Sequence, residues 1–390
     1  DGFGSIAIAR GSNATATAEG WFSRAIVRGD DSTAEATDGN FNTARVYGNN
    51  NEADATGGNF NTVRIIGDGN TASASGEGFA TAVIIGETNT ATAFAGAGSQ
   101  SKSGSRSKSV IVGSSCVANS VALDGSFAVA RIVGSGSNVL VVGQGRANST
   151  GLIVGTDSSA VSTAEGEGGF GQGSTVVLIG DDNLGTASAL GSRASVLVRG
   201  AGNNGSADSE EGGNAYLKVV GDGNTAQATT VDGRARIVVH GDDNEATAAA
   251  DGGGYATLLL VGDLNDGTAA TSGGRSKVAV LGDENTVRAL ADEGSRALIS
   301  MIGNRNNATV TSFNGSRASS VVTGDDNSAN ADADGESVAL VIVQGHDNAN
   351  AVSADDGAYG VSRILAVDSS SAATAIGGVA LAELVGDNSS

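Results

Sequence analysis

The feature that most constrains this chain is a short glycine-led turn that recurs about every 21 residues along the sequence. Its clearest form is Gly-Asp-x-Asn, as in Gly67 to Asn70 and Gly221 to Asn224. A repeat of roughly 20 to 50 residues is typical of solenoids and similar arrays, in which each unit buries its apolar side against its neighbours. We place the first residue of nineteen such turns at Gly11, Gly29, Gly48, Gly67, Gly86, Gly113, Gly134, Gly155, Gly180, Gly200, Gly221, Gly241, Gly262, Gly282, Gly303, Gly324, Gly345, Asp368 and Gly386.

The residues before each turn alternate in polarity. The residue two before the turn is aliphatic in nearly every copy, and the residue four before it is apolar or small. The position between them admits charged residues such as Arg45 and Lys218. This period of two indicates a strand with one buried face. The core ladder predicted from the position two before the turn includes Val46, Ile65, Ile84, Val219, Val239, Leu260 and Val280.

The residues after each turn alternate too, with alanine at the fifth and seventh positions, as in Ala72 with Ala74 and Ala246 with Ala248. Each repeat therefore predicts a rung of two strands and two glycine-rich turns. Val or Ile on one wall faces Ala on the other across a narrow core. The predicted fold is an all-β solenoid of about 19 two-strand rungs, each 19–21 residues long.

The repeat lengths predict one solenoid over residues 1–390 with three stretches. Residues 1–95 have regular 19-residue rungs, and residues 176–390 have regular rungs of 20–21 residues. Residues 96–175 are less regular. They include a serine-rich basic insert at 96–109, which carries Lys102, Arg106 and Lys108.

Stacked rungs place like residues over one another at about 4.8 Å. An aromatic ladder is predicted seven residues before the turn, where stacked rings stabilise neighbouring rungs. It consists of Phe22, Phe41, Phe60 and Phe79. A turn ladder is predicted from the motif itself. It includes Gly67, Asp68, Asn70, Gly221, Asp222, Asn224, Gly241, Asp242, Asn244, Gly324, Asp325 and Asn327.

The stacked aspartates raise the question of a metal. Carboxylates at Asp68, Asp222 and Asp242 would repel one another along the stack, and Ca²⁺ prefers such oxygen ligands. Solvated aspartates that favour a turn explain the same pattern. Calcium at these positions is therefore a weak possibility beside the expectation of no cofactor.

The sequence contains no arrangement typical of an active site. His240 and His346 are its two histidines, about five rungs apart, and no catalytic triad, phosphate loop or metal-ligand spacing is present. A ladder repeats a residue, whereas an active site needs an unrepeated set of groups. We therefore expect a protein that is not an enzyme.

Composition narrows the partners and the location. The formal net charge of −21 disfavours nucleic acid as a partner, and no apolar run is long enough for a membrane span. The one cysteine, Cys116, has no internal disulfide partner. No leader follows Asp1, and the chain has no proline. The chain is therefore either cytoplasmic or a mature form whose signal peptide has been removed. Its low content of lysine, proline and cysteine favours an extracellular or cell-surface protein.

The rung of about twenty residues with Gly-x-x-Asn-x-Ala at its turn, as in Gly67 to Ala72 and Gly221 to Ala226, resembles the repeats of curli-type functional amyloid subunits. The resemblance implies a secreted bacterial protein that polymerises into matrix fibres, as in a biofilm. Glutamine ladders of the curli pattern are replaced here by Ala and Ile.

Together these features predict a secreted structural subunit that associates with itself. Open sheet edges favour pairing with another chain, so we expect copies to stack end to end into a filament or matrix fibre. The alternative is a monomeric adhesin or surface-binding stalk, in which the flat faces or the basic insert bind a partner.

Overall fold

The computed structural model describes residues 3–96, 106–123, 127–145, 148–165 and 173–385. These residues form strands and turns and no helix, which confirms the predicted all-β fold. The chain divides into two compact units, Asp1–Val196 and Leu197–Ser390. Each unit by itself is a β-solenoid built from two parallel sheets, which we call sheet A and sheet B.

In the first unit, odd-numbered strands pair in parallel to form sheet A and even-numbered strands pair in parallel to form sheet B. Sheet A contains β1 (Ile6–Arg10), β3 (Arg24–Arg28), β5 (Phe41–Tyr47), β7 (Phe60–Ile66), β9 (Phe79–Ile85), β11 (Arg106–Val112), β13 (Phe127–Val133), β15 (Asn148–Val154) and β17 (Gly173–Ile179). Sheet B contains β2 (Thr15–Glu19), β4 (Thr33–Thr37), β6 (Glu52–Thr56), β8 (Thr71–Gly76), β10 (Thr90–Ala95), β12 (Val117–Ala122), β14 (Asn138–Gln144), β16 (Ser159–Glu165) and β18 (Leu184–Leu190). Strand β19 (Arg193–Arg199) spans the boundary between the units.

The second unit repeats this topology. Its sheet A contains β21 (Asn214–Val220), β23 (Arg234–His240), β25 (Tyr255–Val261), β27 (Arg275–Leu281), β29 (Arg296–Ile302), β31 (Arg317–Thr323), β33 (Val338–His346), β35 (Tyr359–Val367) and β37 (Val379–Val385). Its sheet B contains β20 (Asn204–Glu210), β22 (Thr225–Val231), β24 (Glu245–Asp251), β26 (Asp266–Ser272), β28 (Thr286–Asp292), β30 (Asn307–Ser312), β32 (Ser328–Ala333), β34 (Ala349–Asp355) and β36 (Ser370–Ile376).

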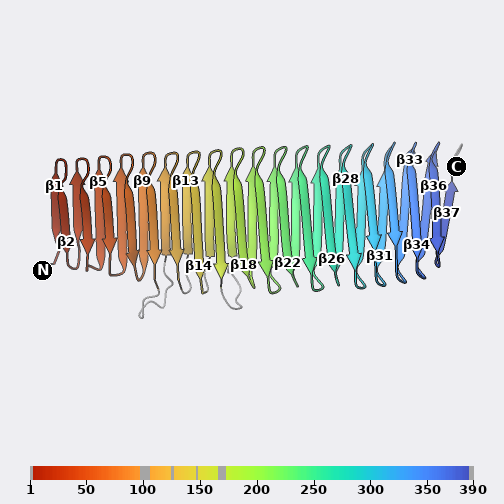
Figure 1. Ribbon diagram of the computed structural model, residues 1–390, viewed down its shortest axis with the longest axis horizontal. Coiled ribbons are helices and arrows are strands. Elements are labelled where there is room, and N and C mark those ends of the chain that lie inside the picture. The colour runs from red at the N-terminus through yellow and green to blue at the C-terminus, as the bar shows by residue number, and fades with distance from the viewer. Residues whose placement is uncertain (1–2, 97–105, 124–126, 146–147, 166–172, 386–390) are drawn as a thin grey trace. The chain divides into compact units, whose positions relative to one another are not determined.

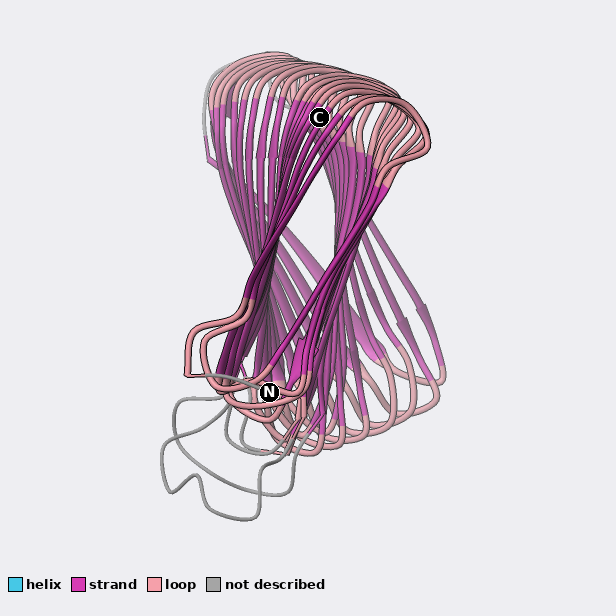
Figure 2. Ribbon diagram, turned by 90° about the vertical axis from the view of Figure 1, so that its left-hand side faces the viewer, coloured by secondary structure: helices cyan, strands magenta, loops and turns pink. Residues whose placement is uncertain are grey.

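A rung consists of one odd-numbered strand, the glycine-led first turn, the next even-numbered strand and a second turn. Figure 1 shows the strands of each unit following one another in sequence order. Figure 2 shows the two sheets as separate layers that the turns join at both ends. The first turns therefore form one edge of each unit, and the second turns form the other.

The register places like residues over like residues. In β5 and β7, Phe41 pairs with Phe60 and Val46 with Ile65. In β23 and β25, Ile237 pairs with Leu258. The step from rung to rung is longer only where the sequence carries insertions before a sheet A strand, as where Phe79 pairs with Arg106.

The core of each unit lies between the two sheets. Alternate residues of both sheets point inward and are buried, while the residues between them are partly or fully exposed. Large inward side chains come mainly from sheet A, including Ile65, Leu217 and Leu258. Alanines such as Ala72 and Ala246 face them from sheet B. Small residues on one wall allow the aliphatic side chains of the other to fill the space between the sheets.

Two local details differ from the sequence expectation. Asp368 is the third residue of its turn and not the first, because Gly345 pairs with Ala366 and the φ of Asp368, 55°, matches the 52° of Asp347. Alanine replaces the leading glycine there, which hid the start of the motif. Strand β11 begins at Arg106, inside the predicted 96–109 insert.

Candidate functional site

The first turn is the most regular surface feature of both units, and its leading glycine has a structural reason. Gly221 and Gly241 have φ of 132° and 137°, a backbone conformation that favours glycine. A Cβ on Gly241 would lie 2.2 Å from the carbonyl oxygen of Gly221 in the preceding rung. The glycine is therefore needed both for the turn and for the close approach of the rung before it.

The second turn residue forms a ladder toward the preceding rung. The backbone N–H of Asp242 donates to Oδ1 of Asp222 at 2.8 Å, and that of Asp263 donates to Oδ1 of Asp242 at 2.7 Å. In the first unit, the N–H of Glu87 donates to Oδ1 of Asp68 at 2.7 Å. Each aspartate thus supplies an acceptor for the backbone of the rung that follows it.

The fourth turn residue forms a second ladder with the opposite sense. The backbone N–H of Asn224 donates to Oδ1 of Asn244 in the following rung at 2.9 Å. Asn244 donates in the same way to Asn265 at 3.0 Å, and Asn327 to Asn348 at 2.8 Å. These side chains are buried, so their hydrogen bonds satisfy polar groups that burial would otherwise leave unpaired.

The two ladders make the two faces of a rung chemically different. Toward the following rung, a first turn presents a side-chain acceptor at its second residue and a backbone donor at its fourth. Toward the preceding rung it presents a backbone donor at its second residue and a side-chain acceptor at its fourth. The faces are complementary, so the turn fixes the polarity in which rungs stack.

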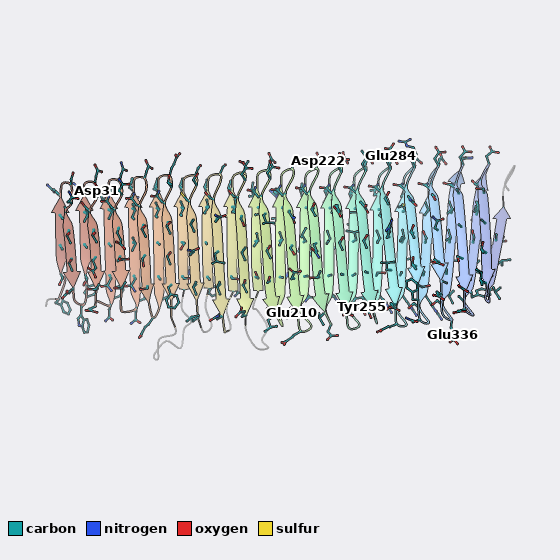
Figure 3. The ribbon with its side chains drawn as sticks, in the orientation of Figure 1. Asp31, Glu210, Asp222, Tyr255, Glu284 and Glu336 are labelled. Carbon is teal, nitrogen blue, oxygen red and sulfur yellow. The ribbon has the colours of Figure 1, made fainter. Side chains whose placement is uncertain are left out.

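The predicted turn residues all lie in these first turns. Gly67, Asp68 and Asn70 belong to the first unit, and the sets at Gly221, Gly241 and Gly324 belong to the second. Asp325 accepts from the N–H of His346 at 2.8 Å. Exposed acidic residues continue this edge, as Figure 3 shows for Asp31 in the first unit and for Asp222 and Glu284 in the second.

The geometry offers no ready-made calcium cage. Asp68, Asp222 and Asp242 are exposed, and each uses one carboxylate oxygen in the ladder. Among the described residues, no group of three acidic, histidine or cysteine side chains lies close enough together to hold a metal ion. Weak binding of calcium to this edge stays a prediction.

The predicted core ladder lies in sheet A. Val46, Ile65, Ile84, Val219, Val239 and Leu260 are completely buried, and Val280 is 4 % exposed. Glycine replaces alanine on the opposite wall where the aliphatic residues are largest. A Cβ on Gly267 would lie 2.6 Å from Leu258 Cδ2 and 2.8 Å from Leu260 Cδ1.

The four predicted phenylalanines stack in one file: Phe41, Phe60 and Phe79 begin β5, β7 and β9 of sheet A, and Phe22 lies in the turn before β3. Ring centroids of Phe22 and Phe41 lie 5.1 Å apart, those of Phe41 and Phe60 4.7 Å, and those of Phe60 and Phe79 4.9 Å, with interplanar angles of 3° to 4°. The rings remain 38 % to 46 % exposed. They stabilise neighbouring rungs and also form an exposed aromatic file.

Cys116 occupies the asparagine position of its turn. Its Sγ accepts from the N–H of Asn89 at 3.4 Å, and its own N–H donates to Ser137 Oγ at 3.0 Å. Burial raises the pKa of the thiol, with smaller opposing effects from hydrogen bonds. The thiol therefore continues the ladder between an asparagine and a serine.

Sequence reasoning missed a set of buried polar residues in the first unit. Ser107 and Ser120 face each other across the core with their Oγ atoms 2.7 Å apart, and Ser149 and Ser162 do so at 2.8 Å. Serine at an inward position hides the apolar alternation, which explains why Arg106 to Ser109 was assigned to an insert. The available signal was the spacing to the next turn, which still fits a strand.

The basic insert is described only in part. Lys102 lies outside the described residues. Arg106 and Lys108 point outward from β11 and are exposed. His240 and His346 end β23 and β33 and are exposed as well.

Fold and turns together define a β-solenoid repeat protein. The chain shows no significant match to any protein-family model, curated protein or solved structure. In the part of the chain that the structure describes, no helix could span a membrane.

Proposed function

We propose that this chain is a secreted structural protein whose copies stack end to end into an extracellular filament or matrix fibre. The observation that carries the proposal is the complementarity of the two faces of a rung. The acceptor at Asp242 and the donor at Asn244 on one face match the donor and acceptor that any rung of the same pattern presents on its other face. The first turn at Gly11 to Ala14 carries alanine at its fourth residue, so a second copy that precedes it could continue the ladder of the second turn residue only.

The strand edges support the same association. Among the described strands, β1 pairs only with β3 and β37 only with β35. An unpaired strand edge favours hydrogen bonding with another strand. The opposed ladders would require such stacking to be head to tail, since an inverted rung would place donor against donor.

The resemblance of the rung to curli-type repeats supports a setting for this assembly. We infer a functional amyloid of a cell surface or biofilm matrix, with copies of the chain as its partner. Catalysis, a resident cofactor and nucleic acid have no part in this proposal, because the surface is built from repeated residues and not from an unrepeated set of groups.

Electron microscopy of the purified chain over a range of concentrations tests the proposal. We expect filaments whose length increases with concentration and whose growth is accelerated by fragments of preformed filaments. Uniform single particles at the highest concentration, with or without such fragments, would rule out end-to-end stacking.

A monomeric surface-binding stalk is the second candidate, favoured by the exposed aromatic file of Phe22, Phe41, Phe60 and Phe79. Exposed aromatic residues are enriched at binding surfaces. Under this alternative, Phe41→Ser with Phe60→Ser would abolish attachment to a cell or matrix surface. Assembly would be unchanged.

A further inference from the structure

The outward faces of the two sheets carry opposite charge. In the first unit, strands β1 to β17 of sheet A carry eight lysines and arginines and no acidic residue. Strands β2 to β18 of sheet B carry five acidic residues and no lysine or arginine. We call the two outward surfaces face A and face B.

The charges of the two faces coincide in the first three rungs. On face A, the basic residues of the first four rungs are Arg10, Arg24, Arg28, Arg45 and Arg64. On face B, the acidic residues of the first three rungs are Glu19, Glu35, Glu52 and Asp54. Pairing in sheet B sets Thr33 beside Glu52 and Glu35 beside Asp54.

The acidic group on face B has no cation of its own. No ion pair joins Glu35, Glu52 or Asp54 to a described lysine or arginine. Burial and the neighbouring carboxylates Glu52 and Glu35 raise the pKa of Asp54, against a hydrogen bond from Ser73. Like charges therefore crowd together here, and a positive surface placed over them would relieve the repulsion.

The next rungs are mainly apolar on both faces, although face A also carries Arg106, Lys108 and Arg131 and face B carries Glu165. Face A presents aliphatic side chains from β9 to β17, which are Val83, Ile85, Val110, Val112, Val129, Val133, Leu152, Val154, Val177 and Ile179. Face B presents Phe94, Val117, Val121, Leu140, Val142, Val161 and Leu184 from β10 to β18. Several of them are exposed large hydrophobic side chains, including Ile85, Phe94, Val112 and Leu140.

We propose that face A of one copy docks on face B of a second copy, with the two copies in the same orientation and equivalent rungs at the same height, so that the facing strands run in opposite directions. Basic residues then face acidic residues in the first three rungs, and apolar side chains meet apolar side chains in most of the rungs that follow. Both faces have the rung spacing of one solenoid, so the match continues from rung to rung. Two sheets packed face to face lie about 10 Å apart, which brings these outward side chains into contact.

A second copy of the chain, as the partner, accounts for more of these surface features than an anionic polymer does. A polyanion would engage the arginines of face A and leave the acidic and apolar rungs of face B without a role. The second unit has the same separation of charge. Its sheet A strands carry eight lysines and arginines with one acidic residue, Glu383. Its sheet B strands carry eight acidic residues with one arginine, Arg288.

Docking of face A on face B is a heterologous contact. Each copy keeps one free face of each kind, so association continues sideways into layers. This lateral association goes beyond end-to-end stacking and does not depend on it, because it uses outward side chains and no strand edge.

Three variants of the 390-residue chain test the proposal. The first removes charge from face A by Arg24→Gln, Arg45→Gln and Arg64→Gln. The second removes it from face B by Glu35→Gln, Glu52→Gln and Asp54→Asn. The control removes three exposed turn carboxylates by Asp31→Asn, Asp157→Asn and Asp182→Asn, at left-handed positions that asparagine tolerates. Circular dichroism checks that each variant is folded.

Sedimentation velocity at low ionic strength gives the readout, with protein solutions free of nucleic acid and polysaccharide. The wild type and the control are expected to associate with similar affinity, and the face A and face B variants at least tenfold more weakly. Mixing the two variants is the decisive arm. The intact face B of one then meets the intact face A of the other, and the mixture should form dimers and nothing larger.

The proposal is overturned if the face B variant associates like the wild type, or if the mixture associates no more than its components. Loss in the face A variant alone would identify an anionic polymer, or a contact between two A faces. If end-to-end filaments form, the face variants should keep them at single width. Loss of the filaments themselves would concern the proposed function and not the lateral contact.

Discussion

At the scale of single residues, most of the first turn interacts with the neighbouring rungs. Gly241 leaves room for the carbonyl of Gly221, Asp242 accepts from the following backbone, and Asn244 accepts from the preceding one. Hydrogen bonds of this kind contribute about 1 kcal/mol each when both partners are satisfied. Contacts between rungs therefore determine the residues of the turn motif more than the conformation of the turn itself does.

The ladder at Asp242 predicts that an amide can replace the carboxylate. Asn49 and Asn304 already accept the same backbone bond, from Asp68 at 3.0 Å and from Asp325 at 2.8 Å. We expect Asp242→Asn to keep or raise the thermal unfolding midpoint, because the acceptor stays and a repulsive charge goes. Asp242→Ala should cost about 1 kcal/mol. Equal destabilisation by both variants would show that the charge, and not the acceptor, matters.

Asp54 predicts a pH dependence of stability. Its raised pKa means that the folded state binds this proton more readily than the unfolded state. Stability therefore falls as the pH rises from the ordinary carboxyl range near about 4 through the raised pKa. Asp54→Asn should raise the unfolding midpoint at neutral pH, and its advantage should shrink on acidification. Asp31→Asn is the control, and an advantage that does not change with pH would contradict this account.

At the scale of strands, the side-chain volumes of the two sheets compensate each other across the core. Sheet A supplies Leu258 and Leu260 where sheet B supplies Gly267, whereas Val139 and Val141 of sheet B lie next to Gly151 of sheet A. Because interiors are closely packed, the sheets can keep a constant separation only if a large residue on one wall meets a small one on the other. Each rung therefore has its own combination of large and small core residues, although the backbone outline of the rungs is the same.

Gly267 tests this compensation. Gly267→Val places atoms in the space of both leucine side chains and should destabilise the protein by about 1–3 kcal/mol. Leu258→Ala frees that space, so the combined variant should be more stable than the sum of the two single effects predicts. Denaturant unfolding with hydrogen exchange at β25 and β26 gives the measurement. Additive effects would show that the two walls do not contact each other at this point.

Most of the fold could be predicted from the sequence because its two periods are independent and agree. The period of two identified the strands, and the spacing of the turns identified the rungs. Each signal failed where an unusual residue type occupies a regular position of the repeat. Ser107 interrupts the apolar alternation at a core position, and Ala366 replaces glycine at the start of a turn. The opposite senses of the two ladders could not be predicted, since asparagine and aspartate offer an acceptor in either direction.

At the scale of the whole molecule, net charge conceals the distribution of charge. A value of −21 disfavoured an anionic partner, but it averages acidic turns and an acidic sheet B with a basic sheet A. The alternation along each strand, combined with the assignment of strands to sheets, was enough to separate the two faces. Long-range attraction and repulsion therefore depend on which face approaches a partner.

The exposed carboxylates of the first turns give a prediction about metal ions. Because each of Asp68, Asp222 and Asp242 uses an oxygen in the ladder and none belongs to a cluster of three ligands, EDTA should leave the unfolding midpoint unchanged. Added Ca²⁺ should act only as Mg²⁺ does at equal ionic strength. A calcium-specific rise in the midpoint, abolished by Asp222→Asn with Asp242→Asn, would establish the calcium site.

The central claim is that a rung's two faces complement each other, so that one copy continues the stack of another with the same polarity. High-resolution electron cryomicroscopy of assemblies formed by the 390-residue chain tests it most directly. We predict that the rung spacing of about 4.8 Å runs through the junction between copies, with the strands of each sheet parallel and the ladder of the second turn residue continued across it. A junction with inverted polarity, or one that leaves the strand edges of both copies unpaired, would contradict the account.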